Sequence, residues 1–249
     1  MLFFNDKLKK LSQFCANKGF YKRGNAFFRK HGDGVLQVIK YRKSTYPWKQ
    51  EYISIGIFSL YGELMPQWLT SAGCIPRYEP RWLDPEVRKK TIEASASNHY
   101  TQDDIDVIFN WELDLAFVER VVLPYLDSVD TQKKAVEAIM FLDAEASGAY
   151  RTPVLWNDIL KFAPFLYSGD YENAEKVIQS ILDQHAHAFE SNAKHFTPEQ
   201  FAAYMERNRP GEESLENLKQ LVKSRDVSAI EAYLRNNYEN NIKLAKFLR

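Results

Sequence analysis

A change of hydrophobic period along the chain limits the possible folds more than any other feature. Apolar and polar residues alternate in VLQVIKY (35–41) and EYISIGIFSLY (51–61), and glycine-containing turn signals precede the first of these segments. From about residue 155 the apolar residues recur at helical spacing instead. Strands followed by helices predict an α+β fold, with an antiparallel sheet in the N-terminal half and a helical C-terminal half.

The N-terminal part begins with a predicted helix over residues 5–17, which Gly19 ends. Turn signals at Gly24-Asn25 and in HGDG (31–34) then separate short aromatic-rich segments, so we expect an antiparallel meander. In residues 35–41 the alternation predicts a strand with one wetter face.

The middle of the chain gives weaker signals. Four prolines between residues 62 and 100 predict a loop-rich connection, with a short strand near 74–78. TQDD at 101–104 is typical of a helix start, and ELDLAFVERVVLPYL predicts an amphipathic helix that ends near Pro124. A helix over 131–142 follows, and the small residues of SGAYRTP (147–153) predict a linker.

The C-terminal segment WNDILKFAPFLYSGDYENAEKVIQSILDQHA predicts a helical hairpin with a tight turn at residues 168–170. The hairpin is similar to one tetratricopeptide unit, but no second copy follows at that family's period of about 34 residues. Thr197 to Gln200 form a predicted capping box, and further helices are expected at 213–223 and 226–247. We therefore predict an α+β domain over 1–147 and a helical domain over 148–249.

Composition narrows the class of protein. With 249 residues and 45% hydrophobic residues, the chain has enough apolar material for a globular core. Two cysteines, Cys15 and Cys74, cannot build a disulfide framework or a zinc cluster. No signal-peptide core or membrane-spanning run is present, so we expect a cytoplasmic protein with no membrane association.

Charge is distributed unevenly although the net charge is zero. Residues 1–50 hold 12 basic and 2 acidic side chains, a balance of 12 − 2 = +10, and residues 101–150 hold 3 basic and 11 acidic ones, a balance of 3 − 11 = −8. Such an uneven distribution of charge has two interpretations. The charged segments either steer a charged partner to one face of the protein, or they neutralise each other inside the fold. The sequence leaves both interpretations open.

Signatures of catalysis are missing from the sequence. There is no GxSxG motif, no recognisable cysteine nucleophile and no phosphate-binding glycine loop. His185 and His187 would point about 200° apart on a helix, although His187 and Glu190 could share a face with His195 nearby. We expect no enzyme activity, no metal and no cofactor, with a metal-dependent hydrolase as the least favoured alternative.

Two clusters of charged residues are candidate interaction sites. The acidic cluster Asp103, Asp104 and Asp106 could bind magnesium, but we favour the structural interpretation, because acidic residues in a first helical turn are stabilised by the helix dipole and need no metal to explain them. The basic cluster is interleaved with aromatic residues, which suits phosphate contacts and base stacking, although aromatics at strand spacing usually fill a core. Its candidate residues are Lys22, Arg23, Arg29 and Arg42.

The segment GFYKRGNAFFRKHGDGVLQVIKYRKS, followed by ISIGIF and LPYL, resembles an uncharacterised bacterial family known as a domain of unknown function. The resemblance covers about residues 1–142. It implies an α+β N-terminal module but no catalytic residue, since the family has no established activity. The matching positions are Gly19, Phe20, Gly24, Asn25, Phe28, Arg29 and residues 123–126.

These observations favour a non-catalytic protein-interaction module, of the immunity or accessory kind found in bacterial conflict systems, whose partner is another protein. Nucleic-acid binding through the basic N-terminal sheet is the alternative. The arrangement of the basic and acidic segments in the fold distinguishes internal neutralisation from an exposed partner site.

Overall fold

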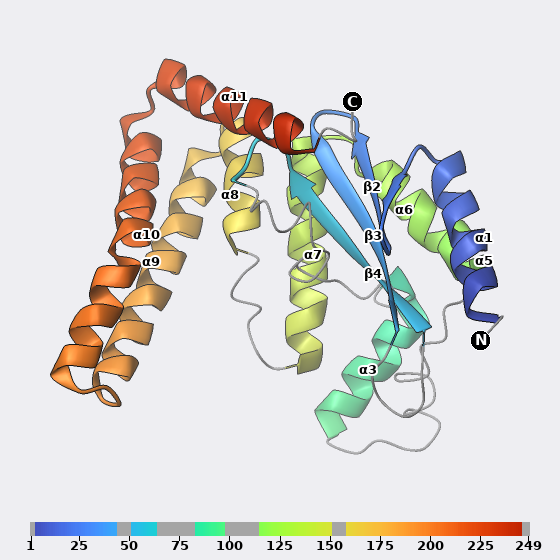
Figure 1. Cartoon of the computed structure of the whole chain (residues 1–249), viewed down its shortest axis with the longest axis horizontal. Helices are drawn as coiled ribbons and strands as arrows, with labels where there is room; N and C mark the ends of the chain where they lie inside the picture. The colour runs from blue at the N-terminus through green and yellow to red at the C-terminus, as the bar shows by residue number, and fades with distance from the viewer. Residues whose placement is uncertain (1–2, 44–50, 64–82, 98–114, 151–157, 246–249) are drawn as a thin grey trace.

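A four-stranded antiparallel meander forms the centre of the computed structural model, which describes residues 3–43, 51–63, 83–97, 115–150 and 158–245 (Figure 1). The strands are β1 (Tyr21–Arg23), β2 (Ala26–His31), β3 (Val35–Lys43) and β4 (Glu51–Ser59), in the order β1-β2-β3-β4. Each strand pairs with the next one along the chain, in registers such as Phe27 with Ile39 and Ile39 with Ile55. The predicted meander is therefore confirmed.

Glycines make the two predicted turns of this sheet possible. Gly24 has a φ of 61° and opens a two-residue loop between paired Arg23 and Ala26, as a type II′ hairpin requires. In the β2–β3 turn, Gly32 has a φ of 48°, and a Cβ there would lie 1.8 Å from the carbonyl oxygen of Asp130. The second turn thus brings the sheet into direct contact with the backbone of Asp130.

Helices cover both faces of the sheet (Figure 1). The helices α1 (Phe3–Asn17), α5 (Leu115–Phe117) and α6 (Leu123–Ser128) lie over one face, and α7 (Gln132–Tyr150) and α8 (Asp158–Tyr167) lie over the other. All residues of β3 from Val35 to Tyr41 are buried as a result. The expectation of one wetter face is wrong, because the helices that follow later in the chain cover it.

The middle of the chain contains more helix than its prolines indicate. Helix α3 (Pro85–Ser97) begins at a proline, where a missing amide costs nothing, and Asp84 accepts from the amide of Glu86 at 2.9 Å. The helix predicted to end near Pro124 continues to Ser128, through the one-turn π-helical segment η2 (Val118–Val122). The amide of Leu123 bonds the carbonyl of Val118, five residues back, and Pro124 then lies in the first turn of α6, where a proline is tolerated.

Helix α7 also exceeds its predicted range. It begins at Gln132, close to the expected start, and runs to Tyr150 rather than ending at residue 142. The first four residues of the predicted linker, 147–150, are therefore helical, because a glycine and small residues do not prevent a helix from continuing. The short strand predicted at 74–78 and the TQDD helix start lie outside the described residues.

The C-terminal helices are α8, α9 (Tyr171–Ala193), α10 (Pro198–Ser224) and α11 (Val227–Leu244). The predicted turn at 168–170 is confirmed, with a φ of 73° at Gly169. The capping box is also confirmed, since the side chains of Thr197 and Gln200 each bond the other's backbone amide. A separate helix at 213–223 is wrong: α10 is one helix of 27 residues that passes through Pro210.

Two hydrophobic clusters fill the interior. The first lies around the sheet, and the second joins α8 to α11 through residues such as Phe162, Ile178 and Leu218. Helix α11 contributes to both clusters, with Leu234 in the second and Tyr238 packed against the first. The predicted boundary after residue 147 stays a prediction, and the helical part is firmly attached to the sheet.

Helices α9 and α10 extend beyond the second cluster, whose last members along this pair are Leu182 on α9 and Leu215 on α10. We call residues 183–214, which form the far end of the hairpin, the distal arm. In Figure 1 it projects downward on the left, away from the sheet. Within the described ranges, none of the helices combines the length and apolarity that a membrane span needs.

Candidate interaction surfaces

The predicted basic and acidic segments form ion pairs with each other at Asp127. Arg29 of β2 donates to a carboxylate oxygen of Asp127, at the end of α6, over 2.7 Å, and Lys18 reaches the other oxygen over 2.8 Å. Only 6% of Arg29 is exposed. This candidate residue therefore neutralises a residue of the acidic segment rather than facing a partner.

Further hydrogen bonds hold Arg29 in place. Its Nε and Nη2 both donate to the side-chain oxygen of Gln37, at 3.0 and 2.6 Å, and Nη1 also donates to the Lys18 carbonyl. The Gln37 amide in turn donates to the carbonyls of Leu126 and Val129. Burial disfavours the Asp127 carboxylate, but the Lys18 and Arg29 hydrogen bonds outweigh it and lower its pKa. The network joins the sheet to α6.

The other predicted basic residues do not form an open stacking surface with their aromatic neighbours. Lys22 and Arg23 are exposed on the edge strand β1, with Lys22 Nζ 5.9 Å from the ring centre of Phe27. Phe27 and Tyr41 are buried, and Arg42 is half-buried with no hydrogen-bond partner for its Nε among the described residues. The candidate residues Asp103, Asp104 and Asp106 lie outside the described ranges.

The described histidines and Cys15 are not arranged for metal binding or for nucleophilic catalysis. His187 Nδ1 lies 3.8 Å from a Glu190 oxygen with both side chains mostly exposed, and no cluster of three metal-ligating side chains occurs in the described parts of the chain. Cys15 is fully buried, and burial raises the pKa of its thiol to about 12. A thiol in that state is an inert core residue.

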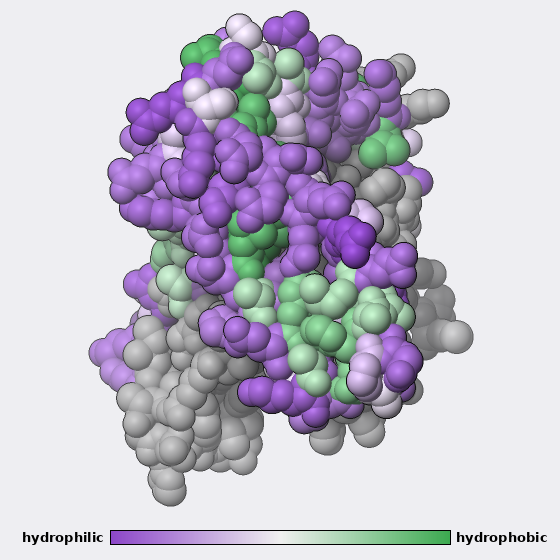
Figure 2. Space-filling view, turned by 90° about the vertical axis from the view of Figure 1, so that its left-hand side faces the viewer, coloured by the Kyte–Doolittle hydropathy of each residue, from purple (hydrophilic) through white to green (hydrophobic). Residues whose placement is uncertain are grey.

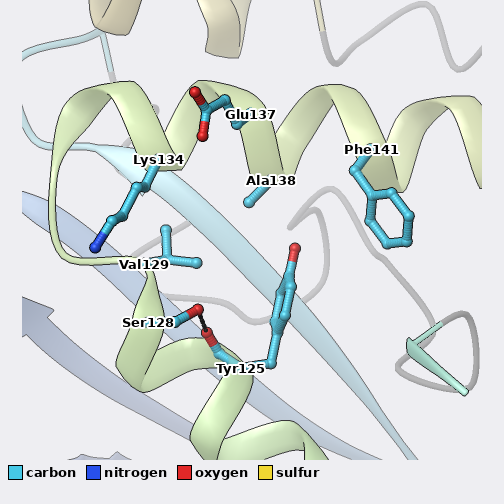
Figure 3. Close-up of a pocket in the computed structure, with 7 residues that line it drawn as sticks. All are labelled: Tyr125, Ser128, Val129, Lys134, Glu137, Ala138 and Phe141. Atoms are coloured by element: carbon cyan, nitrogen blue, oxygen red, sulfur yellow. Dashed lines mark hydrogen bonds between the residues drawn. The ribbon is translucent and has the colours of Figure 1, made fainter.

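A groove of about 440 Å³ lies between α6 and α7 (Figure 3). The hydroxyl of Tyr125 points into it toward Ala138 and Phe141, whereas the Lys134 ammonium points away, toward its ion pair with Asp130 at 2.8 Å. Burial raises the pKa of Tyr125 to about 12, so its hydroxyl is a hydrogen-bond donor at neutral pH. The groove can accept an apolar group, but no nucleophile and base meet in it.

A smaller pocket of about 220 Å³ lies between α7, α8 and α9 and contains the ammonium of Lys161. This group bonds Asp143 at 2.7 Å and Asp158 at 2.9 Å. Burial alone would lower the pKa of Lys161, yet the two carboxylates raise it, so the lysine stays charged. A charged, fully paired lysine joins the helices and cannot act as a nucleophile.

Tyrosines gather where the sheet meets the helical part, and sequence reasoning missed them. Tyr61 and Tyr167 both donate to a carboxylate oxygen of Asp33, at 3.3 and 3.0 Å, and the Tyr61 ring stacks on Tyr238 of α11. Burial, Tyr167 and Asp33 together raise the pKa of Tyr61. The rings pack against one another and Asp33 accepts from two of their hydroxyls, so we interpret this cluster as a structural seam.

The distal arm presents a different surface. Phe189, Phe196 and Phe201 surround Tyr204, with ring centres 5.4 to 6.4 Å from it, and these rings remain only partly buried. Phe196 is 38% exposed. On the left-hand face of the molecule, hydrophobic residues gather in the lower part, at the height of the distal arm (Figure 2). The arm therefore exposes apolar surface that its two helices cannot cover.

Comparison with known proteins identifies no relative: no protein family, no curated protein and no solved structure matches this chain. The resemblance to a domain of unknown function stays a prediction. A functional assignment therefore has to come from the geometry of the molecule itself.

Proposed function

We propose that this protein is a non-catalytic protein-interaction module that binds its partner through the distal arm. The observation that carries the proposal is the half-buried aromatic cluster around Tyr204, which lies beyond the last core residues of α9 and α10. Aromatic side chains are enriched in protein interfaces because they bury a large area with little loss of conformational freedom. We therefore infer that this surface is a protein–protein interface.

The state of the other polar groups supports the proposal. Arg29, Asp127 and Lys161 are held in internal ion pairs, and Cys15 is protonated in the core. Catalysis needs polar groups that converge on open space with suitable pKa values. In the smaller pocket Lys161 instead joins two helices through Asp143 and Asp158, and in the groove the Lys134 ammonium points away, to Asp130.

A site-specific photocrosslinker tests the proposal. We would place it at Ala203, an exposed residue of the distal arm, and at the control position Ala232, an exposed residue of α11. In cells of the native host, we expect one protein species to crosslink at Ala203 and not at Ala232. Nuclease treatment should leave this adduct unchanged, since the proposed partner is a protein.

Two outcomes would contradict the proposal. Equal labelling at both positions would indicate non-specific contact, and a nuclease-sensitive adduct at Ala203 would favour nucleic acid as the partner. To connect the adduct to the aromatic cluster, Phe196→Ala should abolish crosslinking at Ala203. Val227→Ala, which removes another exposed apolar side chain on α11, should leave it intact.

A further inference from the structure

We propose that Tyr61 and Tyr167 are a site of oxidative modification, at which a dityrosine cross-link forms and fastens α8 to the end of β4. The site is separate from the proposed interface, since both residues lie outside the distal arm. Tyr61 follows β4 by two positions, Tyr167 is the last residue of α8, and the end of β4 lies beside α8 (Figure 1). Their ring centres are 4.4 Å apart, and the ring planes are inclined by 35°. Two segments distant in the sequence thus present a pair of adjacent phenols.

The carboxylate of Asp33 provides the base that this chemistry needs. An oxidised phenol is a strong acid, so its proton leaves with the electron, to an acceptor within hydrogen-bond reach. The hydroxyl of Tyr167 donates to Asp33 Oδ1 over 3.0 Å, and the hydroxyl of Tyr61 donates to the same oxygen over 3.3 Å. One carboxylate oxygen therefore serves both phenols.

The shared acceptor also places the reacting carbons near each other. In dityrosine the two rings are joined at the carbons next to their hydroxyls. In the structure both hydroxyls converge on one oxygen atom and the ring centres are 4.4 Å apart, so the carbons beside the hydroxyls lie close together. Reactive groups held together in this way behave as if they were highly concentrated. Coupling within the pair is therefore favoured over reaction with another molecule.

The reaction balances with a one-electron oxidant, such as the oxidised haem of a peroxidase. Each phenol gives one electron to the oxidant and its hydroxyl proton, through Asp33, to water. The two phenoxyl radicals then form a carbon–carbon bond, and the hydrogens on the coupled carbons move to the oxygens, which restores both phenols. In total two electrons and two protons leave the pair, and they reduce one hydrogen peroxide to two waters.

Neighbouring tyrosines lack this arrangement. Tyr238 stacks on Tyr61 with ring centres 5.0 Å apart, but its hydroxyl accepts from the Lys30 ammonium over 2.6 Å, and that nitrogen lies 5.2 Å from the ring centre. A cation in this position opposes the removal of an electron from the ring. Tyr21, on the edge strand β1, is 53% exposed, compared with 40% for Tyr167. Exposure alone would favour reaction at Tyr21, whereas the geometry favours the Tyr61–Tyr167 pair.

Oxidation of the full-length protein tests this inference. The protein is treated with a haem peroxidase and limiting hydrogen peroxide, and dityrosine is measured by its fluorescence and by mass spectrometry of the cross-linked peptides. We expect an intramolecular link between Tyr61 and Tyr167, with a yield that dilution of the protein does not change. Because this link closes a loop of about 100 residues, we expect the Tm to rise by roughly 5–10 °C.

Substitutions separate the phenols from the base. Tyr167→Phe removes one phenol and should abolish the link. Asp33→Asn keeps the size of the side chain but removes the base, so the link should form about tenfold more slowly. The matched control is Tyr238→Phe, which keeps the ring stacked on Tyr61 and should change neither the yield nor the position of the link. Thermal unfolding before oxidation verifies that each variant is folded.

Three results would overturn the inference. Dityrosine that maps to Tyr21, or whose yield falls on dilution, would show that exposure decides and that the link joins separate molecules. The same rate in Asp33→Asn as in the wild type would reject the carboxylate as the base. A link between Tyr61 and Tyr167 that leaves the Tm unchanged would show that it does not fasten α8 to β4.

Discussion

The sheet and the distal arm differ in where their charges point. Around the sheet, buried Arg29 and the more exposed Lys18 are both paired with Asp127, and the polar atoms of Gln37 are shared between β2 and α6. On the arm, Glu206 and Glu213 face solvent and the aromatic cluster is only half covered. The comparison shows that the first region uses its polar groups for its own stability, whereas the second leaves Glu206 and Glu213 exposed to solvent.

The largest expected effect comes from breaking the internal pair. Arg29→Met keeps the length of the side chain but leaves the Gln37 oxygen and part of the Asp127 carboxylate without a partner. Removing one member of a fully buried ion pair costs about 3–5 kcal/mol, and because the Asp127 side chain is 33% exposed to screening water we expect a smaller loss, about 2–3 kcal/mol. We expect urea unfolding to show a loss of that size, and Arg235→Met, on the exposed face of α11, to stay within about 0.5 kcal/mol of the wild type.

A smaller effect is expected when the pH is lowered. The folded pKa of Asp127 is depressed, so its contribution is present above the unfolded pKa of about 3.9 and is lost as pH falls through the folded pKa. Asp127→Asn should therefore lower stability by roughly 1–3 kcal/mol at neutral pH, and this difference should shrink below about pH 4. Denaturant unfolding at several pH values measures it.

The exposed neighbour Asp130 provides the control for this pH dependence. It pairs with Lys134 at the surface, where water screens the interaction. Asp130→Asn should change the pH profile of unfolding much less than Asp127→Asn. Equal changes in the two variants would mean that the buried network does not distinguish the sheet from ordinary surface charge.

Much of the fold could be predicted because its signals are local. Gly24-Asn25 and Gly169 specify turns by their backbone freedom, and Thr197 with Gln200 caps α10 through neighbouring atoms. The wrong prediction for β3 depended on contacts distant in sequence, because the helices that bury its polar face come from other parts of the chain and leave no signal in a short window. The π-helical turn before Pro124 is local, but its apolar spacing does not distinguish it from an α-helix.

The sites were harder to predict, for the same reason. The basic and acidic segments were recognisable from charge counts, but only the fold pairs Arg29 with Asp127 across 98 positions of sequence. The tyrosine seam joins Asp33, Tyr61, Tyr167 and Tyr238 from four separate segments.

A third prediction tests whether the distal arm can unfold locally while the sheet stays folded. Thr197→Ala removes the hydroxyl that accepts the Gln200 amide and thus opens the capping box. Loss of such a cap costs about 1 kcal/mol. Because the arm lies beyond the core, we expect faster amide hydrogen exchange in the first turns of α10 and little change in the strands. Uniform acceleration through β3 would show that arm and sheet unfold as one unit.

The smallest effect distinguishes two glycines that have equal space around them. A Cβ at Gly211 or at Gly169 would meet nothing within 4 Å, but Gly169 has a φ of 73° while Gly211 is helical. Gly211→Ala should therefore stabilise the protein by about 0.5–1 kcal/mol, since alanine loses less entropy in a helix. Gly169→Ala should destabilise it by about 1 kcal/mol through left-handed backbone strain. Opposite shifts in Tm for the two variants would confirm this prediction.

A destabilised Gly211→Ala variant would contradict it. That result would mean that a side chain at position 211 disturbs the packing of the distal arm, and that the outer surface of the arm is less exposed than the comparison with the sheet implies.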